Sequence, residues 1–316
     1  MTGRSFRGTS FGVRGTGGGM GAEANHPGGG MYARLESEAY DSLRDVVLSA
    51  GGIDLGLYKD RCLLRRIAVR QRACGASDLR TYLRIVSRDP IERERLVKAL
   101  TIHVSQFFRN PSTFQVIQRE ILPAVLDAKE RTGGRALRLW SVGCACGEET
   151  YSLALLLLEA GRGVVERYST VVYGSDIEPD CLRFAREGSY PAASLRSVPA
   201  QWKQPYFTAT EAGYQVGPAL RRLVSFKSHN VLEPMPFRRI DLVVFRNVLI
   251  YMTEALQERV LLALHETLNP GGFLVLGKVE GLAGAARAVF EAVNIPERIY
   301  RVCGPAGLPP GGGAGV

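Results

Sequence analysis

The chain has little of what a membrane, secreted or disulfide-bonded protein needs. No apolar run approaches the ~20 residues that cross a bilayer, and the N-terminus carries Arg and Gly without the apolar core of a secretory signal. The six cysteines are irregularly spaced, which is typical of reduced thiols inside a cell. We therefore expect a soluble cytoplasmic protein with no direct membrane insertion.

Several cofactor and partner classes also lack their signatures. Cys144 and Cys146 form one C-x-C pair, but no second Cys/His pair has matching spacing, so we predict no metal. The G-x-G-x-x-G fingerprint of nicotinamide enzymes is absent. No basic tract is interleaved with aromatic residues for base stacking, so we expect no nucleic-acid partner. The net charge of +9 implies an anionic partner, a role that an acidic protein surface can fill as well as nucleic acid.

Composition divides the chain into five parts. Residues 1–30 contain 11 glycines and are expected to form a disordered tail, because they cannot bury enough apolar surface to offset ordering entropy. Residues 31–105 carry apolar residues at helical spacing and predict a small helical domain, with helices at 39–48, 58–73, 78–86 and 90–101. Residues 106–132 predict a linker and a helix, and 304–316 a second disordered tail.

Residues 133–303 alternate between β-rich runs and helical segments. Strands are expected at 137–142, 171–175, 241–245 and 273–276, with helices between them. This alternation predicts an α/β fold with a doubly wound, parallel, Rossmann-like sheet. The stretch at about 206–229 breaks the alternation, and its runs 214–216 and 223–226 are expected to pair as a small antiparallel β insertion.

Polar residues follow three predicted strands, where open α/β sheets bind ligands. A glycine-containing loop at 143–147 leads into Glu149, Asp176 ends the second strand, and Arg246-Asn247 ends the third. The loop suits a methyl donor, another nucleotide cofactor or a simple tight turn. Asp176 can bind ribose hydroxyls or cap the next helix, and Glu149 can bind an ammonium group or complement a helix dipole.

Six segments together resemble the chemotaxis-receptor (chemoreceptor) glutamate O-methyltransferase family. They are S-Q-F-F-R at 105–109, W-S-V-G-C-A-C-G-E-E-T-Y-S at 140–152, S-D-I at 175–177, H-N-V-L at 229–232, F-R-N-V-L-I-Y at 245–251 and L-N-P-G-G at 268–272. The resemblance extends over roughly residues 35–303. It implies an S-adenosylmethionine-dependent enzyme that methylates glutamate side chains and releases S-adenosylhomocysteine.

The resemblance also implies roles for individual residues. Cofactor contacts fall on His103, Ser105, Arg109, Glu149, Asp176, Asn230, Val231, Arg246 and Asn247. Arg109 and Tyr251 take the positions near the transferred methyl. His103 and Ser105 stand where the family often has Asn and Thr, so the contact at His103 is in question, whereas Ser105 keeps a hydroxyl.

A basic helix in the first domain suggests how a receptor is recognised. Arg61, Arg65, Arg66 and Arg70 include two pairs spaced by four residues, so part of the charge lies on adjoining helix faces. By resemblance, these arginines dock a monomeric enzyme on the acidic helical bundle of a chemoreceptor cytoplasmic domain; the alternative is a solvated basic face. In some family members the insertion grips a C-terminal receptor peptide, but the turn at 208–213 is short for this. The second functional hypothesis is a catalytically inactive relative that keeps the cofactor pocket for regulation.

Overall fold

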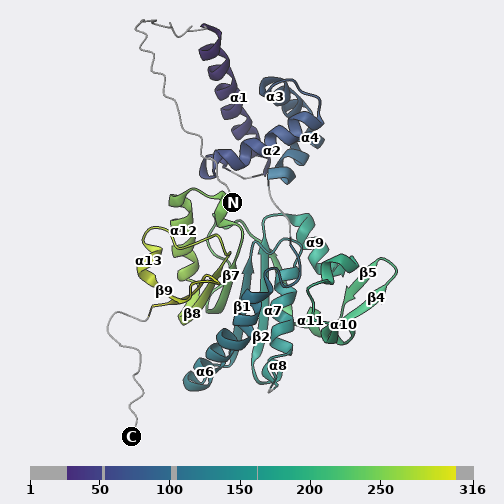
Figure 1. Cartoon of the computed structure of the whole chain (residues 1–316), viewed down its shortest axis with the longest axis vertical. Helices are drawn as coiled ribbons and strands as arrows, with labels where there is room; N and C mark the ends of the chain where they lie inside the picture. Colours follow the sequence, from purple (N-terminus) through teal and green to yellow (C-terminus); the bar gives the residue numbers. More distant parts are fainter. Residues whose placement is uncertain (1–26, 52–53, 101–104, 162, 304–316) are drawn as a thin grey trace, which may run out of the picture.

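A computed structural model of the chain describes residues 27–51, 54–100, 105–161 and 163–303 (Figure 1). The expected tail 304–316, most of the expected tail 1–30, and His103 lie outside these ranges. Helices α1–α4 form one body at one end of the molecule, and a sheet covered by helices forms the other. Within the described residues no helix is long and apolar enough to cross a membrane.

The predicted helical domain is present. It consists of α1 (Pro27–Gly51), the 3₁₀ turn η1 (Leu55–Leu57), α2 (Asp60–Ala73), α3 (Leu79–Arg88) and α4 (Pro90–Leu100). The apolar stripes of these helices meet in a core that includes Leu43, Ile67, Tyr82 and Leu96. Helix α1 begins at Pro27, a residue that suits a first helical turn, so it starts inside the segment expected to be a tail.

The larger domain contains a seven-stranded sheet. Its strands are β1 (Ala136–Val142), β2 (Ser169–Asp176), β6 (Val224–Ser228), β7 (Ile240–Phe245), β8 (Leu268–Leu276), β9 (Phe290–Asn294) and β10 (Ile299–Val302). The order is β6-β2-β1-β7-β8-β10-β9. The first five strands are parallel, and β10 runs antiparallel to both β8 and β9. The sheet is thus mixed, with an antiparallel edge that the sequence did not predict.

Helices cover both faces of this sheet. The helices of the larger domain are α5 (Pro111–Val116), a π-helical segment η2 (Ile117–Ile121), α6 (Leu122–Thr132), α7 (Glu148–Leu158), α8 (Val164–Arg167), α9 (Pro179–Glu187), α10 (Ala200–Tyr206), α11 (Pro218–Leu223), α12 (Glu254–His265) and α13 (Ala286–Val289). Alternate residues of β7 enter different cores: Leu242 and Val244 join the core that includes α7, and Val243 and Phe245 join the core that includes α12. This is the expected doubly wound arrangement.

The small antiparallel β insertion is also present, but its pairing differs from the prediction. Strand β5 (Gly213–Val216) pairs with β4 (Phe207–Thr210) and with β3 (Ser189–Tyr190). The run expected to pair with 214–216 instead becomes the end of α11 and the strand β6, which lies parallel to β2 in the main sheet. The prediction of that hairpin was wrong because a long-range parallel pairing leaves no local turn signal in the sequence.

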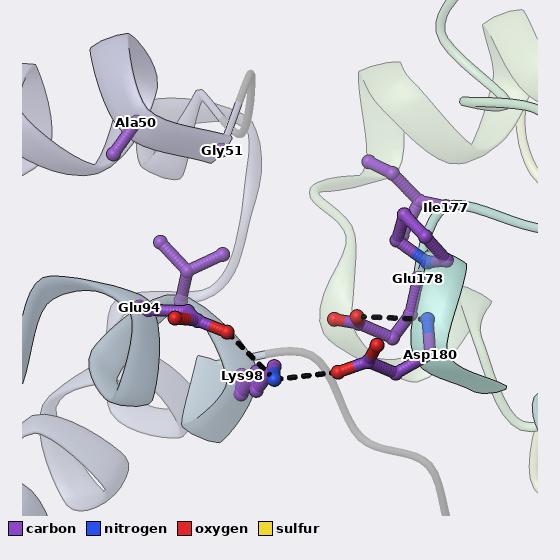
Figure 2. A pocket seen from close by; sticks show the side chains of 9 residues that line it. Ala50, Gly51, Glu94, Lys98, Ile177, Glu178 and Asp180 are labelled. Carbon is purple, nitrogen blue, oxygen red and sulfur yellow. Dashed lines mark hydrogen bonds and ion pairs between the residues drawn. The ribbon is translucent and has the colours of Figure 1, made fainter. Parts of the chain in front are cut away.

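The two domains contact each other at the carboxyl edge of the sheet. The Lys59 N–H donates to the Tyr251 carbonyl at 2.8 Å, and the Thr253 N–H donates to the Leu57 carbonyl at 3.0 Å. Farther along the edge, Lys98 of α4 forms an ion pair with Asp180 of α9 at 2.6 Å (Figure 2). Beside that pair lies a cavity of about 400 Å³, lined from α1, α4 and the start of α9. The helical domain thus sits over the strand ends that carry the predicted site.

Candidate active site

The predicted site residues gather where the chain order of the sheet reverses. Strand β1 lies between β2 and β7, so the loops that follow β1 and β7 leave in opposite directions and open a crevice at their tips. A cavity there is lined by Ser105, Gln106, Arg109, Gly143, Cys144, Ala145, Glu149, Arg246, Asn247, Val248 and Tyr251. Six of these eleven were predicted as site residues from the sequence: Ser105, Arg109, Glu149, Arg246, Asn247 and Tyr251.

The loop after β1 has a shape that requires glycine. Gly147 has φ +91°, and an added Cβ would lie 2.7 Å from the Ala185 Cβ, so a larger residue is excluded by backbone strain and by contact. Asp176 Oδ2 accepts a hydrogen bond from the Ala145 N–H at 2.8 Å, and its Oδ1 accepts from the Glu178 N–H at 3.0 Å. Asp176 therefore ties the glycine loop to the turn before α9, while Glu178 is the N-cap of that helix.

A buried ion pair forms the floor of the cavity. Glu149 Oε2 lies 3.1 Å from Arg246 Nη1, and Glu149 Oε1 accepts from the Ser141 hydroxyl at 2.8 Å. Arg246 Nη2 donates to the Arg109 carbonyl and to Asn110 Oδ1. Burial raises the pKa of Glu149, an effect that the Arg246 guanidinium partly offsets. Arg246 Nε has no hydrogen-bond partner among the described residues, so this buried pair is not fully satisfied.

The groups predicted to surround the transferred methyl line the same cavity. Arg109 follows Phe107 and Phe108, which are buried in the core of the larger domain, so its backbone is anchored. Tyr251 ends the 3₁₀ turn η4 (Leu249–Tyr251) after β7. The Arg66 guanidinium of α2 lies 5.8 Å from the centre of the Tyr251 ring, which links the helical domain to the crevice.

Glu280 is a residue of this region that the sequence reasoning missed. It is 5% exposed, and its carboxylate accepts from the backbone N–H groups of Asn247, Ile250 and Gly277. Asn247 has φ +62°, a left-handed conformation that is uncommon for residues other than glycine but that Asn adopts more readily than most. Glu280 therefore holds the Arg246–Tyr251 loop in shape. In the sequence, Glu280 is recognisable only as an acidic residue a few positions beyond the end of β8, and that position alone predicts no specific role.

Of the remaining predicted cofactor residues, the three that the structure describes, Asp176, Asn230 and Val231, lie outside that cavity. The His229 N–H donates to the Asp176 carbonyl at 3.0 Å, which brings the end of β6 beside Asp176. Asn230 follows, with its Oδ1 accepting from the Leu232 N–H at 3.0 Å, and Val231 packs partly buried against the core. Asp176, Asn230 and Val231 thus extend the strand edge beyond β1, away from the Glu149–Arg246 pair.

The four arginines predicted to dock a partner occupy different surroundings. Arg65 is exposed, whereas Arg66 donates to the Ala99 carbonyl at 2.6 Å. Arg70 binds Glu92 through both Nε and Nη2, and Glu92 is 2% exposed. The side chain of Arg61 lies outside the described part of the chain. Of the three described arginines, only Arg65 is therefore exposed to solvent without an internal contact of this kind.

Family models and individual known proteins both match this chain to CheR methyltransferases. The model of the all-alpha domain of CheR methyltransferases matches residues 38–101, and that of their SAM binding domain matches residues 103–299. The chemotaxis protein methyltransferase of Listeria monocytogenes is 31% identical over 84% of this chain and 97% of its own length. Chemotaxis protein methyltransferase 1 of Pseudomonas aeruginosa is 32% identical over 73% and 85%. An uncharacterised 104.1 kDa protein of Rhodobacter capsulatus is 31% identical over 89% of this chain, which spans 29% of that longer protein.

Proposed function

Because the chain belongs to the CheR methyltransferase family, we propose that it transfers a methyl group from S-adenosylmethionine to glutamate side chains of a chemoreceptor. The products are glutamate methyl esters and S-adenosylhomocysteine, and the ester marks serve chemotaxis adaptation or a related signalling pathway. The observation that carries this proposal is the crevice between β1 and β7, where Glu149, Arg246, Arg109 and Tyr251 line one cavity.

The charges of the crevice fit the methionine end of the methyl donor, which carries one ammonium and one carboxylate. The Glu149 carboxylate can bind the ammonium, and guanidinium donors of Arg246 and Arg109 can bind the carboxylate. The unsatisfied Arg246 Nε supports a polar ligand here. Asp176 keeps acceptor capacity beyond its two backbone bonds, so it can take ribose hydroxyls, with Asn230 and Val231 beside it. Ser105 and Asn247 line the walls, and His103 remains part of the proposed set.

The reaction needs no general base. A glutamate carboxylate has a pKa near 4.3 and is ionised at neutral pH, so it attacks directly, while the electrons of the sulfur–methyl bond return to the sulfur. The task of the protein is to orient the carboxylate in line and to exclude water, which contributes several kcal/mol. Arg109 would hold the substrate carboxylate through its planar fork, and Tyr251 would donate to the second oxygen.

Receptor recognition is assigned to the exposed face of α2. Arg65 and Arg72 are exposed there next to Leu64 and Val69, which are 45% and 51% exposed. A basic face with apolar side chains matches an acidic amphipathic helix of a receptor bundle. Arg61 belongs to this face by its spacing, whereas Arg66 and Arg70 would support it from inside. We propose that the protein is a cytoplasmic monomer with no nucleic-acid partner. It binds the receptor bundle directly, and its β4–β5 turn does not bind a C-terminal receptor peptide.

The direct test is methylation of a purified chemoreceptor cytoplasmic fragment with a radiolabelled methyl donor. We expect protein-bound label that mild base releases as volatile methanol, because carboxyl methyl esters hydrolyse easily. A receptor fragment with Gln in place of its acceptor Glu residues is the matched control and should take up no label.

Two results would overturn the proposal. Base-stable label would indicate methylation of nitrogen or another group. Donor binding without any transfer to several receptor fragments would instead favour the catalytically inactive, regulatory reading of the fold.

A further inference from the structure

The C-x-C segment of the glycine loop has a feature that methyl transfer does not use. Cys146 Sγ lies 3.4 Å from Cys181 Sγ, which is in the first turn of α9. The two residues are 35 positions apart in the chain and come from different elements. We propose that Cys146 and Cys181 are an oxidation site, which a peroxide converts to a disulfide that weakens methyl-donor binding.

The chemistry of the two thiols suits a pair with distinct roles. Cys146 is partly exposed, whereas Cys181 is 8% exposed, so a small oxidant reaches Cys146 first. The contact with Cys181 lowers the pKa of the Cys146 thiol, and the same contact raises the pKa of Cys181. Because the thiolate is the reactive form, Cys146 is the attacking sulfur and Cys181 the resolving one.

The reaction balances with hydrogen peroxide as the oxidant. The Cys146 thiolate attacks one peroxide oxygen and breaks the O–O bond, giving a sulfenic acid and hydroxide, which takes a proton to become water. The Cys181 thiol then attacks the sulfenic sulfur, forming the S–S bond and releasing a second water. Overall, two thiols lose two electrons and two protons, and peroxide is reduced to two waters.

Cys144, the other cysteine of the glycine loop, is less suited to this reaction. Cys144 is 2% exposed, and burial raises the pKa of its thiol well above the ordinary value. Metal binding is the other use of close thiols, but no group of three His, Cys, Asp or Glu in the described chain could hold a metal ion. Oxidation is therefore the chemistry that the Cys146–Cys181 contact favours.

The disulfide would act on the donor site through the loop. A disulfide is about 2.0 Å long, so the sulfurs must approach by more than 1 Å. The start of α9 is held by the Lys98–Asp180 ion pair (Figure 2), so the loop is the part expected to move. Its anchors are the Ala145–Asp176 hydrogen bond and the bond from the Tyr190 hydroxyl to the Cys146 carbonyl at 2.6 Å. Moving them displaces Asp176 and the wall formed by Ala145.

The effect on binding rests on the proposed function, whereas disulfide formation does not. The full chain is reduced, freed of reductant, treated with hydrogen peroxide, blocked with N-ethylmaleimide and digested without reduction for mass spectrometry. We expect a peptide in which Cys146 is joined to Cys181, lost in Cys146→Ser and Cys181→Ser and retained in the matched control Cys74→Ser. Calorimetry with S-adenosylhomocysteine should show at least tenfold weaker binding after oxidation, restored by dithiothreitol.

The outcomes of these experiments separate the oxidation site, its effect on donor binding and the proposed function. If Cys146 and Cys181 both remain alkylatable after peroxide, or if Cys146→Ser leaves the cross-link intact, the oxidation site is refuted. If the cross-link forms but affinity is unchanged, its proposed effect on donor binding is refuted. Reduced protein that binds no S-adenosylhomocysteine would contradict the proposed function, while the cross-link would still be judged by mass spectrometry.

Discussion

Each domain contains a glutamate that pairs with an arginine, and the two pairs differ in how fully their hydrogen bonds are made. In the helical domain, Glu92 accepts from both Arg70 donors and from the Tyr82 hydroxyl. In the crevice, Glu149 accepts one bond from Arg246 and one from the Ser141 hydroxyl, and Arg246 Nε has no partner among the described residues. Burial acts to raise both pKa values, but the hydrogen bonds at Glu92 outweigh it and lower that pKa, whereas Glu149 stays raised. A satisfied pair stabilises a fold, while an unsatisfied pair beside a cavity is suited to a ligand.

The largest expected effect is on stability in the helical domain. Glu92→Ala leaves the Arg70 guanidinium without its partner and should lower the free energy of unfolding by about 3–5 kcal/mol. Because the pKa of Glu92 is lowered, its contribution is present above its unfolded pKa and is lost as pH falls through the folded one. Urea unfolding measures this, with Glu149→Gln as the matched variant, which should cost much less. Equal losses would remove the contrast between the two pairs.

Arg109→Ala should have the largest effect on activity. Removing a donor that orients the reacting carboxylate should lower turnover by about 100-fold or more, while the melting temperature changes little. Arg119→Ala is the control, since Arg119 is exposed on η2. Methyl transfer to a receptor fragment is the measurement. Turnover equal to that of the unmodified protein would exclude Arg109 from the reaction.

The pH dependence of donor binding should identify Glu149. Its pKa is raised above the ordinary 4.5, so it gains a proton at a pH where exposed glutamates remain ionised. Affinity for S-adenosylhomocysteine should therefore begin to fall at that higher pH. For an acid with a raised pKa, protonation favours the folded state, so the loss would not come from unfolding at this residue. Calorimetry over a pH series should show the fall, and a Glu149→Gln variant should flatten it; an unchanged profile would contradict the assignment.

The smallest effect is expected at the docking surface. Arg65→Glu should raise the Michaelis constant for the receptor several-fold at low salt and less at high salt, since exposed charges are screened. Turnover at saturating receptor should be unchanged. Arg131→Glu, on α6, changes the net charge equally and is the control. The same shift in both variants would indicate a general charge effect instead of docking on α2.

The parts that could be predicted from the sequence depended on local patterns. Asp176 and Arg246 stand at strand ends, and Glu149 stands in the first turn of the helix that follows β1, so the parallel fold predicts that they share one edge. The sequence carries no comparable local signal for long-range strand pairing. Strand β6 pairs with β2 across about 50 residues, and the residues of β9 and β10 show only a weak strand pattern. The partners Arg70–Glu92 and Glu280–Asn247 depend on tertiary packing, and spacing alone could not show that Arg70 faces inward.

We propose that the crevice between β1 and β7 binds the methyl donor through the Glu149–Arg246 pair, whose Arg246 Nε has no partner among the described residues. Titration calorimetry with S-adenosylhomocysteine tests this binding, using the unmodified chain, Glu149→Gln and the exposed control Glu120→Gln. We expect saturable binding at one site, weakened about tenfold to 100-fold by Glu149→Gln, the range of a lost charge-assisted hydrogen bond, and unchanged by Glu120→Gln. No binding by the unmodified chain, or equal affinity in all three proteins, would contradict it.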